Sequence, residues 1–348
     1  MKLISKHFNL SFGVIICTYN RQNILERSLQ SWDSVHYPPD QFIVVDASDN
    51  ASINRNLFES KFVKLFSKSD SQYILSDKPG LTFQRNLGID ALKTDIVCFV
   101  DDDSFVSPNY VEKILEVFAK DHHQFVGGVN GVAKGQFDNI LQKNYRLFRN
   151  YLRHNFGSHL QRIHVPKTQT QLFSSLPQNL QGLPLIDIDR LWGANMNYRS
   201  SLVKSQRFDE NFLRYGLFED VEFSVRIGKS HKLVCRLDAE LSHDNSLGES
   251  SRPNDIKYFL SSWLNSAYII EKLLPYQECR NSHKNYFDLL RAISKLLPNS
   301  LQNKKVKTFG NEDLRERAFN YIVSLSQCHD FSMLSERFVD FQNQIYST

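Results

Sequence analysis

Strand-like and helix-like segments alternate through the first hundred residues, and this alternation restricts the available folds more than any other feature. The runs FGVIICTY (12–19), FIVVDAS (42–48) and DIVCFV (95–100) are short, apolar and rich in β-branched residues, as buried strands are. The intervening segments RQNILERSLQSW (21–32) and LTFQRNLGIDAL (81–92) have helical character. Strands that alternate with helices predict a parallel sheet with both faces covered, which is an α/β fold.

Polar residues follow each of the three predicted strands. The first strand runs into CTYNR (17–21), the second into DAS (46–48) and the third into DDD (101–103). The carboxyl ends of parallel strands share one edge of the sheet, and ligands bind just beyond that edge. We therefore expect a binding site where these three polar segments meet.

The composition is that of an ordinary globular protein. The chain has 348 residues, of which 41% are apolar and 23% charged, and its net charge of +4 does not indicate a nucleic-acid partner. Five scattered cysteines without a CxxC pair predict buried thiols in a reducing compartment. We find neither a signal peptide nor an uncharged stretch of the ~20 residues that a membrane helix needs, so we expect a cytoplasmic protein.

Two changes in pattern divide the chain. Residues 1–250 form the predicted α/β domain, and helical apolar spacing in 251–348 predicts a C-terminal helical extension, which is also a candidate homodimer surface. Within the domain, residues 134–186 contain seven Lys and Arg residues but one acid, and part of this segment has the pattern of a basic amphipathic helix. This basic insert either is a solvated face, or contacts an anionic membrane surface or a lipid-linked acceptor.

Three consecutive carboxylates, Asp101, Asp102 and Asp103, follow the third strand, and the nearest basic residues in the sequence are Lys93 and Lys113. A solvated acidic turn is one interpretation. The preceding buried strand makes it expensive to leave these charges unpaired, and a divalent cation such as Mg²⁺ or Mn²⁺ would remove that cost. In an extended chain, the first and third aspartates point to one side and the second to the other. We therefore predict a metal site here.

Six motifs occur in a fixed order between residues 10 and 245: CTYNR (17–21), VVDAS (44–48), RNLGIDAL (85–92), VDDDS (100–104), WGANM (192–196) and FEDVEFSVRI (218–227). Their order and spacing resemble those of family-two inverting glycosyltransferases with the GT-A fold. The resemblance implies a Rossmann-like mixed sheet flanked by helices, and a nucleotide-sugar donor.

The resemblance also implies which residues contact the donor nucleotide. They are Thr18, Tyr19, Arg21, Asp46, Arg85, Asn86 and Asp102. Among them, Asp102 would hold the ribose, Asp46 would contact the base region, and Arg85 with Asn86 would close over the nucleotide. Ala47 departs from the family pattern, in which a second acidic or amide residue is common. The choice among UDP, dTDP and GDP donors therefore stays open.

For the metal, the resemblance implies that Asp103, helped by Asp101, binds Mn²⁺ or Mg²⁺ on the diphosphate. His243 is a candidate third contact to the metal or the diphosphate, although a lone histidine is equally often a surface or core residue. Trp192, Gly193 and Asn195 would shape the sugar and acceptor pocket, and the alternative for them is a packed aromatic beside a tight turn.

The acidic pair Glu219-Asp220 opens a helix-like stretch, where acids in a first turn also favour the helix dipole. By resemblance the pair is catalytic. Asp220 would be the base that takes the proton from the acceptor hydroxyl, and Glu219 would orient the acceptor or the sugar.

Together these features predict a metal-dependent inverting glycosyltransferase that transfers a sugar from a nucleotide sugar to a saccharide or lipid-linked saccharide. We expect it to act in surface polysaccharide biosynthesis, in the cytoplasm or peripherally at the inner face of the membrane. One alternative is a sugar-nucleotide nucleotidyltransferase, although CTYNRQN lacks the glycine-rich phosphate loop that such enzymes usually have. A non-catalytic carbohydrate-binding or scaffold protein of the same fold is the other.

Overall fold

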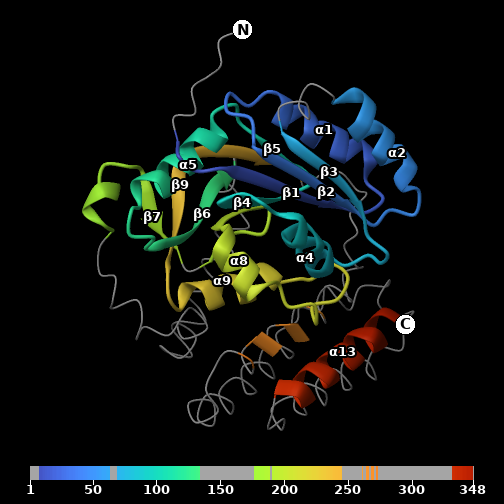
Figure 1. Cartoon of the computed structure of the whole chain (residues 1–348). Helices are drawn as coiled ribbons and strands as arrows, with labels where there is room; N and C mark the ends of the chain where they lie inside the picture. Colours follow the sequence, from blue (N-terminus) through green and yellow to red (C-terminus); the bar gives the residue numbers. More distant parts are fainter. Residues whose placement is uncertain are drawn as a thin grey trace, which may run out of the picture. The chain divides into compact units, whose positions relative to one another are not determined.

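The computed structural model describes isolated residues between 261 and 272, together with residues 8–62, 69–133, 176–188, 190–244 and 331–347 (Figure 1). The chain divides into two compact units, and almost all described residues up to 244 belong to the first. The predicted boundary at 250/251 lies outside the described residues. So does most of the basic insert, including its predicted amphipathic helix.

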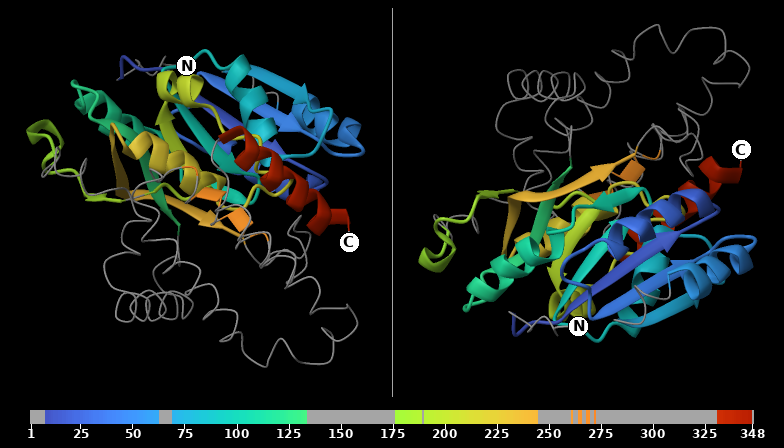
Figure 2. Two further views of the ribbon diagram at one scale, coloured as in Figure 1. Left: turned by 90° about the horizontal axis from the view of Figure 1, so that it is seen from below. Right: turned by 90° about the horizontal axis from the view of Figure 1, so that it is seen from above.

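Within the described residues, nine strands form one sheet: β1 (Phe12–Thr18), β2 (Gln41–Asp46), β3 (Asp70–Leu75), β4 (Ile96–Asp101), β5 (Ser104–Val106), β6 (Val126–Ala133), β7 (Leu185–Asp187), β8 (Asn195–Arg199) and β9 (Lys232–His243). Their order is β3-β2-β1-β4-β8-β6-β9-β5, and β7 pairs with β9. Figure 2 shows orange β9 on one side of the sheet and the blue strands β1 and β2 on the other.

Strands β3, β2, β1 and β4 are parallel neighbours, so the three predicted strands are confirmed in the predicted arrangement. The sequence prediction missed β3, which lies between the second and third predicted strands in the sequence. This strand lies at the edge of the sheet, and its side chains are exposed or half-buried. An edge strand therefore lacks the unbroken apolar run by which the central strands are recognised.

The sheet becomes mixed beyond β4. Strand β8 is antiparallel to both β4 and β6, and β6 is parallel to β9. The parallel sheet expected from the alternation of strands and helices therefore covers only one half. The mixed sheet implied by the family resemblance is the observed one.

Helices cover both faces of this sheet (Figure 1). The described helices of the first unit are α1 (Gln22–Asp33), α2 (Ala51–Asn56) with the π-helical turn Leu57–Lys61, α4 (Leu81–Ala91), α5 (Tyr110–Lys120), the 3-10 turn Gln178–Leu180, α8 (Ser200–Gln206) and α9 (Glu219–Gly228). One core contains apolar residues of α1 and α5, and the other contains those of α4, α8 and α9.

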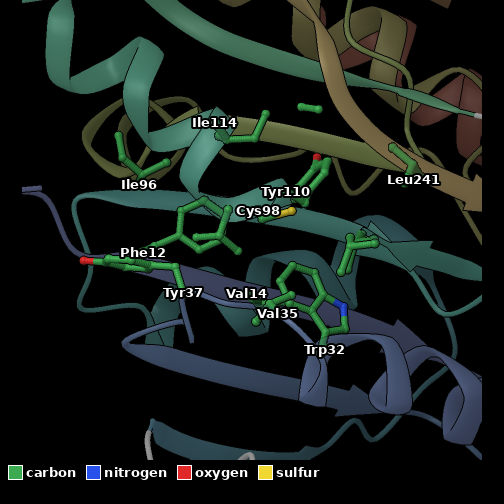
Figure 3. Close-up of a cluster of buried hydrophobic side chains, with 14 of the residues drawn as sticks. Phe12, Val14, Trp32, Val35, Tyr37, Ile96, Cys98, Tyr110, Ile114 and Leu241 are labelled. Carbon is green, nitrogen blue, oxygen red and sulfur yellow. The ribbon is translucent and has the colours of Figure 1, made fainter. Parts of the chain in front are cut away.

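Side chains of β1 lie alternately in the two cores. Phe12 and Val14 belong to the core under α1 and α5, whereas Ile15 belongs to the opposite core. Figure 3 shows the first of these cores, in which the fully buried Trp32 packs edge-on against Tyr110 with ring centroids 6.4 Å apart. Burial on both faces explains why the central strands read as continuous apolar runs.

In the second unit, the described part of the predicted helical extension includes α13 (Phe331–Ser347). Phe338 of this helix stacks on Tyr268 with ring centroids 3.9 Å apart, and Phe212 packs edge-on against both rings. Among the described helices of the chain, none is long and apolar enough to cross a membrane.

Candidate functional site

The carboxyl ends of β1, β2 and β4 meet at one edge of the sheet, as the sequence predicts. Thr18 pairs in register with Asp46, and Cys17 with Asp101. From α4, the buried Gln84 donates to the carbonyl oxygens of Thr18 and Val45, each at 3.0 Å, and so fastens the ends of β1 and β2 together.

Asp102 and Asp103 are paired with a basic residue that lies far away in the sequence. Arg21, after β1, donates to Asp102 Oδ1 at 2.6 Å and to Asp103 Oδ2 at 2.9 Å. The Thr18 hydroxyl donates to Asp102 Oδ2 at 2.7 Å. The sequence suggested unneutralised charge because it shows no basic neighbour. The basic partner instead lies just after β1, the parallel strand adjacent to β4.

Asp101, Asp103 and His243 bring their ligand atoms together, with all of these atoms within 4.8 Å of one another. His243 Nε2 lies 3.0 Å from Asp103 Oδ1, because the antiparallel pairing of β5 and β9 sets His243 opposite Ser104. Two carboxylates and an imidazole are a suitable donor set for Mn²⁺ or a related divalent cation. These three residues are the predicted metal ligands, and they fit such an ion.

Burial makes the negative charge of this cluster costly. It raises the pKa of Asp102 to about 7, although Arg21 opposes the shift. Burial also raises the pKa of Asp101 above its usual value, against the charge of Arg85, and the negative charge of Asp220 adds to this shift. For Asp103, burial is outweighed by hydrogen bonds with His243 and Arg21, which lower its pKa. Additional positive charge would therefore stabilise the cluster.

Glu219 and Asp220 are the first residues of α9, as predicted. Phe218 before them adopts a left-handed conformation with φ of 71°. The two carboxylates differ in exposure, since Glu219 is buried and Asp220 only half-buried. Asp220 Oδ2 accepts a hydrogen bond of 3.0 Å from the backbone N–H of Gly193. The more accessible Asp220 is thus held in place by a backbone N–H.

Arg85 and Asn86 lie next to each other on α4 but face different surroundings. Arg85 is 2% exposed, and its guanidinium contacts Glu219, Asp101 and the carbonyl oxygen of Gly193. Asn86 bonds to Phe208 and Glu210 instead. The structure therefore brings Arg85 into the acidic cluster and does not bring Asn86 there.

The predicted sugar and acceptor residues divide in the same way. The Trp192 ring lies 4.9 Å from the His243 ring, and Gly193 lies between Arg85 and Asp220. Asn195 is fully buried in β8, where its amide oxygen accepts hydrogen bonds from β6 and from Tyr110. Trp192 and Gly193 are thus part of the assembled site, whereas Asn195 holds strands together.

At the β2 end, Asp46 is fully buried and accepts hydrogen bonds from the Ser48 N–H at 2.7 Å, Asn54 Nδ2 at 2.8 Å and the Tyr73 hydroxyl. Tyr19, after β1, is half-buried. Sequence reasoning missed Asn54 and Tyr73. Tyr73 lies on the unpredicted strand β3, and recognising that strand is the signal that would have indicated it.

Residues 13–175 match the family model described as glycosyl transferase family 2. This stretch, just under half of the chain, belongs to the family. Among curated proteins, it is similar to glycosyltransferase GlyA of Streptococcus pneumoniae serotype 4, with 33% identity over 106 residues. That match covers 30% of this chain, and the chain spans only 14% of the length of that relative.

Among solved structures, the chain is similar to residues 1–349 of TarS from S. aureus, with a TM-score of 0.51 and 15% identity over 97% of this chain and 90% of that one. A mannosyltransferase of Pyrobaculum calidifontis in complex with GDP-Man and Mn²⁺ gives a TM-score of 0.47 and 15% identity over 76% of this chain and 63% of that one. The predicted family and the predicted GT-A fold are confirmed.

Proposed function

We propose that this family 2 protein is a metal-dependent, inverting glycosyltransferase that uses a nucleotide-sugar donor. The acceptor is a saccharide or a lipid-linked saccharide. The observation that carries the proposal is the convergence of Asp101, Asp103 and His243, with the half-buried Asp220 close enough to influence the pKa of Asp101. A metal cluster next to a separate carboxylate suits a reaction with a leaving diphosphate and an attacking hydroxyl.

The donor nucleotide binds over the ends of β1, β2 and β4. Asp102 is the candidate ribose contact, and Thr18 and Arg21 hold its carboxylate. Tyr19 is the partly exposed candidate beside them. Asp46 supports the base region by ordering the segment after β2, since its carboxylate is already engaged by neighbouring side chains.

Asp101, Asp103 and His243 would hold the cation. Bound there, Mn²⁺ or Mg²⁺ would supply Lewis-acid stabilisation of the negative charge on the departing diphosphate. The imidazole among the ligands favours Mn²⁺, because Mg²⁺ prefers oxygen donors alone.

Asp220 is the candidate base. It takes the proton of the acceptor hydroxyl while the hydroxyl oxygen bonds to the anomeric carbon and the bond from that carbon to the diphosphate oxygen breaks. Attack from the face opposite the leaving group inverts the anomeric configuration in a single step. The N–H of Gly193 fixes one oxygen of Asp220, and Trp192 supplies an aromatic surface beside the cluster.

The proposal includes a role in surface polysaccharide biosynthesis at the cytoplasmic face of a membrane, supported by the basic insert. Liposome flotation with anionic lipid tests the membrane contact, using charge reversal at Arg146, Arg149 and Arg153. Equal flotation of the charge-reversed and wild-type proteins would remove membrane contact from the proposal.

The decisive experiment is incubation of the full chain with a panel of nucleotide sugars, saccharide acceptors and Mn²⁺, followed by measurement of nucleoside diphosphate release. We expect release with one donor class, its loss with a chelator and its return with added Mn²⁺. A product of opposite anomeric configuration, determined by NMR, establishes inversion. No release with any donor would favour the carbohydrate-binding or scaffold alternative.

A further inference from the structure

Arg85 connects the three chain segments that carry the proposed chemistry. Its guanidinium donates to Glu219 Oε1 on α9 at 2.5 Å and to Asp101 Oδ1 on β4 at 3.2 Å. A third hydrogen bond of 3.2 Å reaches the carbonyl oxygen of Gly193, just before β8. These partners lie 134, 16 and 108 residues away in the sequence.

We propose that Arg85 is a positioning residue, which sets the candidate base Asp220 relative to the candidate metal ligand Asp101, and is not a contact to the nucleotide. This inference rests on the proposed function. It differs from the role that the family resemblance implies for Arg85, which is closure over the bound nucleotide.

The burial of Arg85 supports a positioning role. Arg85 is 2% exposed, whereas the side chain of Asp101 is 33% exposed. The guanidinium lies 5.1 Å from the centre of the Phe208 ring, so an aromatic side chain covers it as well. Arg85 is therefore far less accessible than Asp101, the more exposed of the two carboxylates that it contacts.

Two connections extend the effect of Arg85 to Asp220. Glu219, which Arg85 binds, is the adjacent residue in the first turn of α9. Gly193, whose carbonyl oxygen binds Arg85, donates its N–H to Asp220 Oδ2 at 3.0 Å. A shift of the guanidinium would therefore move both supports of the candidate base.

The contacts that Arg85 makes to Glu219, Asp101 and Gly193 require an arginine. The planar guanidinium can donate to several acceptors in fixed directions, whereas the single ammonium of lysine cannot. Burial alone would lower the pKa of Arg85, but the charges of Glu219 and Asp101 raise it. The residue thus keeps its positive charge between the two carboxylates.

The test compares R85K with R199K in the full chain. Arg199 is a matched control, because it is also buried, donates to a carboxylate at 2.9 Å and to the Val126 carbonyl oxygen at 3.0 Å, and lies 5.1 Å from the Phe118 ring. Its carboxylate partner, Asp121, lies outside the acidic cluster. Both variants therefore remove the same kind of buried contact.

We measure kcat and the donor KM, and the Kd of the matching nucleoside diphosphate with Mn²⁺ by calorimetry. Because small misplacements of reacting groups cost about 100-fold in rate, R85K should lower kcat by about that factor. In R85K, the Kd for the nucleoside diphosphate should stay within about threefold of the wild-type value. In R199K, kcat should stay within about threefold of the wild-type value. Since Arg85 acts through Glu219, combining R85K with E219Q should lower kcat little more than the larger single loss.

Four outcomes separate the alternatives. A Kd that rises about tenfold or more in R85K with unchanged kcat would make Arg85 a nucleotide contact and overturn the inference. Equal kcat losses in R85K and R199K would reduce its role to general stability. If R85K does not fold, E219Q tests the same bridge, and unchanged kcat in that variant contradicts the inference. If wild type releases no nucleoside diphosphate, the proposed function fails, and the inference fails with it.

Discussion

Asp101, Asp102 and Asp103 occupy different environments although they are consecutive in the sequence. Strand β4 ends at Asp101, and the chain then turns into β5. Asp102 points to Thr18 and Arg21, whereas Asp101 and Asp103 offer oxygens to the same cluster as His243. The second aspartate therefore lies outside the group of candidate metal ligands, as the alternation of an extended chain predicts, while Arg21 contacts both Asp102 and Asp103.

At the residue scale, D220N should abolish transfer but keep donor binding. General base catalysis contributes factors of about 10²–10⁴, so we expect the rate to fall by about a thousandfold. Radiolabelled sugar transfer measures the rate, and calorimetry measures the Kd for the nucleoside diphosphate. D90N is the control, because Asp90 is an exposed carboxylate on α4 that pairs with Arg207. Normal turnover in D220N would exclude Asp220 as the base.

His243 provides a second prediction at this scale. Loss of an outer partner of a metal ligand typically weakens metal binding about 10- to 100-fold, and loss of a ligand should weaken it at least as much. H243A should therefore raise the Kd for Mn²⁺ by at least about tenfold, measured by electron paramagnetic resonance. H231A is the control, since His231 contacts Ser230 outside the cluster. Equal Mn²⁺ affinity in H243A and wild type would remove His243 from the ligand set.

At the scale of elements, β9 connects the second half of the sheet to the site. It pairs with β6, β7 and β5 along its length and carries His243 at its last position. Helix α9 also supplies site residues from its end, since its first turn contains Glu219 and Asp220. The candidate metal ligand and the candidate base are therefore both positioned by the ends of secondary-structure elements.

Gly131 in β6 lets β6 and β9 approach closely. A Cβ at this position would lie 2.6 Å from the carbonyl oxygen of Ala239 and 2.7 Å from the Tyr110 ring. Because backbone cannot yield as a flexible side chain can, G131A should reduce the free energy of unfolding by about 1–3 kcal/mol, measured by urea denaturation. G80A is the control, since the nearest atom to its added Cβ is 3.6 Å away. Similar unfolding free energies for both variants would contradict this account of Gly131.

At the scale of the whole molecule, segments between residues 18 and 243 assemble the site, so ligands that bind it should stabilise the folded unit against unfolding. Mn²⁺ with the matching nucleoside diphosphate, at about 100 times its Kd, should add about 2.7 kcal/mol to the free energy of unfolding. Differential scanning calorimetry would record this as a higher Tm. D103N should lose most of the shift. The same shift in D103N would mean that the ligands bind elsewhere.

The sequence by itself determined the central strands and the edge where the polar residues gather, because burial on both faces leaves continuous apolar runs and strand ends are local features. Tertiary structure decided the rest. Strand β3 and the antiparallel strands around β8 depend on pairing between distant segments, as do the partners of Arg21 and Arg85. The burial of Asn195 likewise follows from its strand neighbours. A charge partner is set by which strands become neighbours in space, and distance along the chain does not contain that information.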